Sequence, residues 1–166
     1  MPAGSTYTPI ATTTLGSATP SYTFTAISNA YTDLILISSL PGNQPGANLS
    51  IRVGNGSIDS GSNYSFTQLY GTGSAAASLR ASNQTAMKVG VVAGTNSMQI
   101  VQFQNYSNTT TYKTVLFRGS APSNYVDAAV GLWRSTSAIN QIYIADESGT
   151  NLGVGSTFTL YGIASA

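Results

Sequence analysis

The side chains that could do chemistry in this chain are few and of restricted kinds. The 166 residues include six lysines and arginines and five acids, but no histidine and no cysteine. Without an imidazole or a thiol, the chain cannot build a Ser-His-Asp triad, a Cys-His pair or the usual zinc sites. The chemistry that remains is that of carboxylates, which act as acid–base pairs in glycosidases or as calcium ligands.

The positions of the carboxylates favour structural roles. Asp33 precedes an apolar run and Asp59 lies in a Gly-Ser loop, so both are interpreted as turn residues. Asp146 and Glu147 are neighbours in the turn DESGTNLG, which is typical of a solvated loop end; a weak calcium site that includes Asn151 is the alternative. We therefore predict no catalytic, cofactor-binding or metal site, and no enzyme activity.

The string GTGSAA, residues 71–76, has the Gly-x-Gly-x-x-Ala form of a dinucleotide-binding fingerprint. A working fingerprint also needs a crossover helix and an acid about 20 residues further on. The next acid is Asp127. A glycine-bearing turn is therefore the prediction for this segment.

Trp133, the one tryptophan, is followed directly by Arg134, one of four arginines. In the alternating segment DAAVGLWR, Arg134 shares its parity with Val130, which is expected to face the core. We predict that Trp133 packs over a sheet or a subunit contact. Arg134 is predicted to end the strand with hydrogen bonds to nearby carbonyls or to Asp127 or Asp146. A ligand site at this pair is the alternative.

Period-two alternation recurs along the whole chain, and helical periodicity almost never does. The runs that alternate, or that are apolar on both faces, are SYTFTAI, DLILISSL, NLSIRV, YSFTQLY, MKVGVV, SMQIVQFQNY, YKTVLF, DAAVGLW, NQIYI and STFTLYGI. They are rich in β-branched and aromatic residues and are separated by Gly, Pro and Asn turns. This pattern predicts an all-β fold, an antiparallel β-sandwich that is jelly-roll-like.

Two segments depart from simple alternation. In SMQIVQFQNY the apolar residues change parity between Ile100 and Val101, which predicts a β-bulge or a bend. Residues 74–84, SAAASLRASNQ, could form a helix of one or two turns, so at most one short helix is expected. DLILISSL is apolar on both faces and is expected to be a central strand.

The chain is expected to form one domain, residues 18–166, after an extended N-terminal arm, residues 1–17, where Pro2, Gly4 and Pro9 disfavour regular structure. The N-terminus lacks the charged start and apolar segment of a secretory signal, and the longest apolar run, LILI, is too short to cross a bilayer. A net charge of +1 offers no basic stripe. Nucleic acid and membranes are therefore not expected as partners.

Six blocks of the sequence carry a resemblance to a known family. They are YTPIAT, YTDLILI, GSNYSFTQLYGTGSAAASLRASN, NTTTYKTVLFRG, VGLWRSTSAINQIYI and GSTFTLYGI, and they extend from Tyr7 to Ile163. In these blocks the chain resembles a domain that recurs in virion proteins of tailed bacteriophages, including cyanophages. The resemblance implies a β-sandwich used for assembly, found both in capsid decoration (cement) proteins and at the ends of tail or fibre proteins. It implies no catalytic residues.

The composition agrees with a role in assembly. Charged residues make up 7% of the chain, against about 25% in ordinary soluble proteins. With two lysines in the whole chain, strand edges have few of the charges that usually block edge pairing, and a surface rich in hydroxyl groups loses little when it is buried.

We therefore expect a non-enzymatic, homotrimeric decoration protein, assembled in the host cytoplasm, that braces the major capsid protein on the outer capsid surface. The alternative is a tail or fibre domain that binds host-surface glycans through exposed tyrosines. No cofactor is expected in either case.

Overall fold

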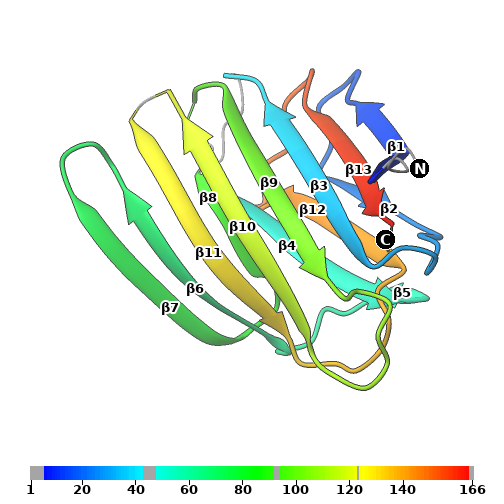
Figure 1. Ribbon diagram of the computed structural model, residues 1–166. Coiled ribbons are helices and arrows are strands. Elements are labelled where there is room, and N and C mark those ends of the chain that lie inside the picture. The colour runs from blue at the N-terminus through cyan, green and yellow to red at the C-terminus, as the bar shows by residue number, and fades with distance from the viewer. Residues whose placement is uncertain (1–5, 43–47, 92–93, 123, 165–166) are drawn as a thin grey trace.

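The computed structural model describes residues 6–42, 48–91, 94–122 and 124–164, which form two antiparallel β-sheets (Figure 1). None of the described residues is helical. The expected antiparallel β-sandwich is therefore confirmed.

The larger sheet has eight strands in the order β1-β13-β3-β9-β10-β11-β6-β7. Their bounds are β1 Tyr7–Thr14, β13 Thr157–Ile163, β3 Asp33–Leu40, β9 Ser97–Gln104, β10 Lys113–Ala121, β11 Tyr125–Trp133, β6 Tyr64–Gly71 and β7 Ala76–Gln84. The segment DLILISSL is strand β3, which lies between β13 and β9 as a central strand, as expected.

The smaller sheet has five strands, with β2, β12, β4 and β5 in that order and β8 paired to β4. Their bounds are β2 Ser21–Phe24, β12 Gln141–Asp146, β4 Asn48–Asn55, β5 Ser57–Ile58 and β8 Met87–Val91. This sheet lies behind the larger one in Figure 1.

The chain passes repeatedly from one sheet to the other. Strands β1 and β3 flank β13 in the larger sheet, while β2 and β4 flank β12 in the smaller sheet. The first strands of the chain therefore enclose the last ones in both layers. This interleaving gives the sandwich its jelly-roll-like character.

The core lies between the two sheets. Because successive side chains point to opposite faces of a strand, every second residue of the central strands is buried. The larger sheet contributes Leu34, Leu36, Val101, Phe103, Val115, Phe117, Phe158 and Leu160, and the smaller sheet contributes Leu49, Ile51, Val53, Met87, Ile142 and Ile144. This packed layer fixes which face of each strand is turned to solvent.

Part of the expected N-terminal arm is a strand of the sandwich. Residues 7–14 form β1, which pairs with β13 from Tyr7 opposite Ile163 to Thr14 opposite Thr157. The register shifts between Pro9 and Ala11. Proline is tolerated in an edge strand at such an irregularity, so Pro9 does not prevent pairing. The first five residues of the arm, with Pro2 and Gly4, lie outside the described residues.

Residues 74–84, the segment that could have formed a short helix, are not helical. Residues 76–84 form strand β7, paired with β6 through a turn in which Gly73 has φ +84°. Nearly every side chain of β7 is exposed, because the β6–β7 hairpin lies at the far end of the larger sheet, beyond the smaller one (Figure 1). A strand with both faces exposed does not need to alternate apolar and polar residues. The sequence of β7 therefore lacks the alternation by which the other strands were recognised. GTGSAA is a glycine-bearing turn, as predicted.

The expected bulge in SMQIVQFQNY is also wrong. Strand β9 pairs with β3 and β10 without a shift of register and keeps its alternation. Ser97, Gln99 and Val101 point inward, so Met98 and Ile100 point to solvent. The apolar residues change parity because the first half of β9 has polar side chains in the interior, Ser97 and Gln99, and apolar side chains on the outer surface, Met98 and Ile100.

One turn of the smaller sheet depends on a missing side chain. A Cβ at Gly54 would lie 1.8 Å from the carbonyl oxygen of Ser57 and 2.8 Å from the Cα of Ile58, both backbone atoms. We expect Gly54→Ala to lower the free energy of unfolding by about 1–3 kcal/mol or more, because the β4–β5 turn must open. Urea denaturation measures this. Gly16→Ala, where no atom lies within 4 Å of the new Cβ, is the control and should change stability by less than about 0.5 kcal/mol.

Candidate functional site

Trp133 holds the two sheets together. Its side chain is 3% exposed and belongs to the core, and its indole N–H donates to Asp59 Oδ2 at 2.7 Å. Asp59 lies in the loop after β5, so the bond joins the end of β11 to the smaller sheet. Burial alone would raise the pKa of Asp59, but hydrogen bonds from Trp133, Asn63 and the backbone of Gly61 lower it below its usual value.

A second bond of the same kind lies next to Trp133. The hydroxyl of Tyr64 on β6 is buried, accepts from the backbone N–H of Val53 at 3.1 Å and donates to the carbonyl of Asp59 at 2.8 Å. Burial raises the pKa of Tyr64. The Trp133 region is therefore a structural joint between the sheets. A packing role for Trp133 was predicted, but on the face of β11 opposite to the core.

Arg134 follows the last residue of strand β11 and is fixed there by hydrogen bonds, as predicted. Its guanidinium donates to Ser65 Oγ at 2.6 Å, to the carbonyl of Ser62 at 2.5 Å and to Asn83 Oδ1 at 2.8 Å. The carbonyl partner was predicted. Asp127 and Asp146, the alternative partners, accept no bond from this guanidinium.

The parity expected for β11 is reversed in the structure. Asp127, Ala129 and Gly131 face the interior together with Trp133, while Val130 faces solvent. The interior above Gly131 is already filled, since a Cβ there would lie 2.5 Å from Met87 Sδ and 2.8 Å from the ring of Phe117. The apolar residues of the opposite parity are therefore left outside.

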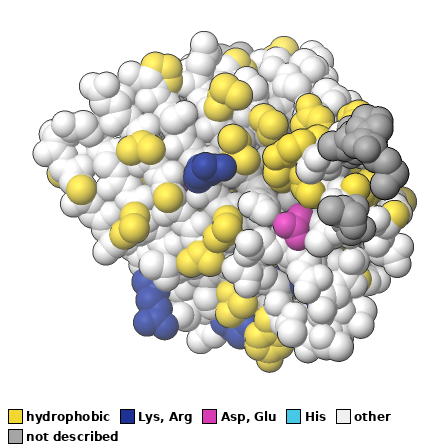
Figure 2. Space-filling view, in the orientation of Figure 1, with side chains coloured by type: hydrophobic (Ala, Val, Ile, Leu, Met, Phe, Trp, Pro, Cys, Tyr) yellow, Lys and Arg dark blue, Asp and Glu magenta, His cyan; other side chains and the backbone are white. Residues whose placement is uncertain are grey.

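The outer surface of the larger sheet is consequently rich in exposed apolar side chains. We call it the outer apolar face, and its exposed members are Leu69, Met98, Ile100, Leu116, Val126 and Val130. The half-buried Ile37 lies opposite Ile100 on the same face. Leu69 is 62%, Val126 59% and Met98 53% exposed. Figure 2 shows hydrophobic side chains spread over this side of the molecule, with a few charged ones among them.

Cross-strand pairing arranges this face in rows. Arg118 of β10 lies opposite Ile100 of β9 on one side and Ala128 of β11 on the other, and Ala128 lies opposite Leu69 of β6. Arg118 is exposed, and its guanidinium has no hydrogen bond or ion pair with any described residue. The face thus has an unpaired cation within an apolar surround. Such surfaces are typical of protein–protein contacts.

The edges of the larger sheet are better protected than the lysine content suggested. One free edge is β1, which has Pro9 at its register shift, and the other is β7, which has the exposed Arg80. Proline, bulges and charge all discourage edge pairing. The face of this sheet is therefore a better candidate for an interface than its edges.

The carboxylates do not converge on a catalytic pair. Asp33, the first residue of β3, accepts from Gln102 Nε2 at 3.0 Å and from the backbone N–H of Asn105 at 2.8 Å. Asp59 binds Trp133. Among the residues that the structure describes, no group of three acids could hold a metal ion. These carboxylates therefore fix strands and loops.

The calcium alternative at residues 146–151 gains no support. Asp146 Oδ1 accepts hydrogen bonds from the backbone and the hydroxyl of Ser148, and Glu147 Oε1 forms an ion pair with Lys88 at 2.5 Å. The carboxylates of Asp146 and Glu147 therefore bind different partners and do not point to a common site.

Asp127 is a buried carboxyl at the interface between β8 and the larger sheet. It is 3% exposed, and its Oδ2 accepts from Gln68 Nε2 at 2.8 Å and from the backbone N–H of Gly90 at 3.1 Å. Oδ1 of Asp127 lies beside Gly119 but accepts no hydrogen bond of normal geometry. Oε1 of the buried Gln99 likewise has no hydrogen-bond partner among the described residues. Burial raises the pKa of Asp127, and the bonds to Oδ2 offset only part of this.

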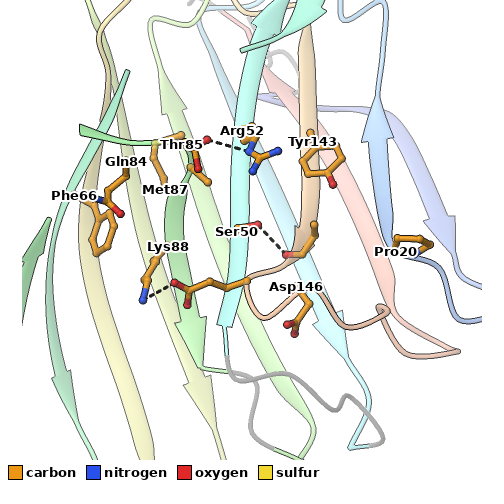
Figure 3. A pocket seen from close by; sticks show the side chains of 14 residues that line it. Pro20, Ser50, Arg52, Phe66, Gln84, Thr85, Met87, Lys88, Tyr143 and Asp146 are labelled. Carbon is orange, nitrogen blue, oxygen red and sulfur yellow. Dashed lines mark hydrogen bonds and ion pairs between the residues drawn. The ribbon is translucent and has the colours of Figure 1, made fainter. Parts of the chain in front are cut away.

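The outer surface of the smaller sheet has a groove that the sequence did not reveal. It encloses about 320 Å³ over strands β4, β8 and β12. Four of the eleven charged residues line it, namely Arg52, Lys88, Asp146 and Glu147. Figure 3 shows Arg52 beside Thr85 and Tyr143, with Lys88 and Asp146 nearer the other end. Only the pairing of β4 with β8 and β12 brings these residues together.

Tyrosines do not form the exposed cluster that a sugar-binding face was expected to need. Of the described tyrosines, Tyr7 and Tyr112 are more than half exposed, and they lie on β1 and just before β10. These two strands are separated in the larger sheet by β13, β3 and β9. A glycan site on this molecule would have to be built differently.

Comparisons with known proteins leave the family open. No family model and no curated protein matches the chain. Among solved structures, an exo-inulinase from Aspergillus awamori is 12% identical with a TM-score of 0.39, covering 95% of this chain and 29% of its own. An alginate lyase from Aplysia kurodai is 11% identical with a TM-score of 0.35, covering 84% of this chain and 72% of its own.

A protein of unknown function from Shewanella oneidensis is 8% identical with a TM-score of 0.27, covering 98% of this chain and 77% of its own. The chain thus spans less than a third of the exo-inulinase chain. At these TM-scores the matches support no conclusion about function. None of the described residues belongs to a helix that could span a bilayer.

Proposed function

We propose that this protein is a non-enzymatic structural protein of a bacteriophage virion, a trimeric decoration protein that braces neighbouring major capsid subunits on the outer capsid surface. The observation that carries the proposal is the outer apolar face. A row of exposed leucine, isoleucine, valine and methionine side chains on a regular sheet is stable in isolation, but it gains free energy when another protein covers it.

The unpaired Arg118 specifies the chemistry of the partner. Burying a guanidinium without a counter-charge costs several kcal/mol, so the covering surface must present a carboxylate or carbonyl oxygens opposite it. Two copies packed through this face would instead bring apolar surfaces and their arginines together without an exposed, unpaired acid. We therefore assign the face to the major capsid protein and the trimer contact to another surface.

Purified particles of the phage that encodes the chain test the proposal directly. Many copies spread over the shell, together with loss of capsid stability when the gene is deleted, are the expected results. A few copies confined to the tail would contradict a decoration role. Sedimentation of the isolated protein tests the trimer.

Replacing Leu69 by aspartate should weaken binding to capsids that lack the protein by at least about tenfold, because a charge then replaces the most exposed apolar side chain of the outer apolar face. Co-sedimentation with capsids measures this. Val154→Asp is the matched control, since Val154 is also exposed but lies in the loop between β12 and β13. Equal binding of the two variants would exclude the outer apolar face as the docking site.

A second candidate function is that of a tail or fibre domain that binds host-surface glycans. The charged groove on the smaller sheet favours it, because small-molecule sites are concave and combine apolar walls with a few polar groups. Its volume lies at the lower end of the range of such sites, about 300 to 1,000 Å³.

A further inference from the structure

Arg52 is the unusual residue of the groove on the smaller sheet. It points outward from β4, and its Nε donates to the backbone carbonyl of Thr85 at 2.9 Å. Its guanidinium lies 5.6 Å from the ring centre of Tyr143 on the neighbouring strand β12. These two contacts hold the side chain across the sheet and so reduce the entropy lost when it binds a ligand.

The terminal nitrogens of Arg52 are free to bind. No described residue accepts a hydrogen bond from Nη1 or Nη2, and none forms an ion pair with this guanidinium. The neighbouring groups are also open, since the hydroxyls of Thr85 and Tyr143 have no partner among the described residues. One end of the groove therefore presents a planar fork of donors flanked by two hydroxyl groups.

The other charged side chains of the groove already have partners. Lys88 and Glu147 form an ion pair at 2.5 Å, and the second oxygen of Glu147 accepts from Asn48 Nδ2 at 2.8 Å. Asp146 is bound by Ser148 and lies away from Arg52 in Figure 3. Arg52 is thus the cation of the groove that has no ion-pair partner among the described residues, and its terminal nitrogens are open to an incoming ligand.

We infer that this groove binds a saccharide that bears a carboxylate, with the carboxylate held by the two terminal nitrogens of Arg52. Arginine recognises a carboxylate through two parallel hydrogen bonds, a geometry that a lysine cannot reproduce. The hydroxyls of Thr85 and Tyr143 in the groove lining offer hydrogen-bonding groups for sugar hydroxyls, and Pro20 and Ala145 supply an apolar wall. The inference rests on the second candidate function and adds its ligand class and its binding residue.

The test uses the full chain and three carboxylated probes, oligogalacturonate, oligoglucuronate and a sialylated oligosaccharide, each compared with its methyl ester. Esterification keeps the sugar skeleton and removes the charge. Calorimetry should show binding of at least one acid and about tenfold weaker binding of its ester. Amide chemical shifts should change at Arg52, Thr85 and Tyr143.

Two variants separate recognition from folding. Arg52→Lys keeps the charge but not the fork, and it should weaken binding of the acid by about tenfold, the effect of losing one charge-assisted hydrogen bond. Arg80→Lys, an equally conservative change on β7 outside the groove, should leave binding unchanged. Far-UV circular dichroism and the urea midpoint should be the same for both variants and the wild type.

The outcomes distinguish the inference from the function on which it rests. Equal binding of acid and ester would keep a glycan-binding function and overturn recognition through Arg52. Unchanged binding by Arg52→Lys would do the same. Absence of binding to all six probes would overturn the inference and remove the support that the groove gives to the second candidate function.

Discussion

Replacing Trp133 by alanine is expected to lower the free energy of unfolding by about 3–5 kcal/mol, the largest effect of any single change considered for this protein. The substitution leaves a cavity the size of an indole between the sheets and removes the only N–H that the side chain donates to Asp59. Urea denaturation followed by far-UV circular dichroism measures the loss, because the variant lacks the only tryptophan fluorophore.

Trp133→Phe separates packing from hydrogen bonding at this position. It keeps most of the ring volume but leaves Asp59 Oδ2 without its indole donor, so we expect a loss of about 1–3 kcal/mol at neutral pH. The exposed aromatic Tyr112 provides a control, since Tyr112→Ala should change stability by less than about 0.5 kcal/mol. If Trp133→Phe matched the wild type, the bond to Asp59 would make no contribution.

The same bond predicts a change at acid pH. The pKa of Asp59 is lower in the folded than in the unfolded chain, so its stabilising effect is present above the unfolded value of about 3.9 and is lost as the pH falls through the folded value. In Trp133→Phe the pKa of Asp59 returns towards the usual value. The acid decline in stability should therefore be shallower in the variant than in the wild type.

Asp127→Asn is expected to make the protein more stable than the wild type at pH 7. The pKa of Asp127 is raised in the folded chain, so the folded state holds its proton more tightly than the unfolded state. Stability from this group is greatest below about pH 3.9 and falls as the pH rises from there through the folded pKa. Because the amide of the Asp127→Asn variant cannot ionise, the variant does not lose this stability as the pH rises.

Asp127→Ala is the matched comparison. It removes the acceptor of Gln68 Nε2 and of the Gly90 N–H, and each buried donor left without a partner costs about 1–3 kcal/mol. Urea midpoints between pH 4 and pH 8 should therefore place Asp127→Asn close to the wild type at pH 4 and increasingly above it as the pH rises, with Asp127→Ala below Asp127→Asn at every pH. If Asp127→Asn were as unstable as Asp127→Ala at pH 7, the folded protein would need the ionised carboxylate, contrary to the raised pKa.

The two carboxyls act in different pH ranges, which lets one titration test both. The Asp59 effect lies below the ordinary carboxyl pKa and the Asp127 effect lies above it. Each variant should therefore change only one side of the stability profile. Overlap of the two changes would show that the groups are coupled, although Asp127 lies near the start of strand β11 and Asp59 bonds Trp133 at its end.

The sequence by itself determined the class of the fold and the absence of histidine and cysteine chemistry. Alternation in runs such as DLILISSL and NQIYI is local, because neighbouring side chains of a strand always point to opposite faces. It therefore predicted most strands correctly and, from their number and the turns between them, the antiparallel sandwich. The missing histidines and cysteines likewise exclude chemistry that needs them, whatever the fold.

Only the tertiary structure decided which face of each strand is buried and which residues become neighbours. In β11 the sequence shows that Val126 and Val130 share a face, but only the rings packed above Gly131 turn that face to solvent. Strand β7 has no buried face, so alternation could not reveal it. Arg52, Thr85 and Tyr143 meet because three strands far apart in the chain lie side by side. Parity is a property of one strand, whereas burial and proximity depend on how the two layers pack.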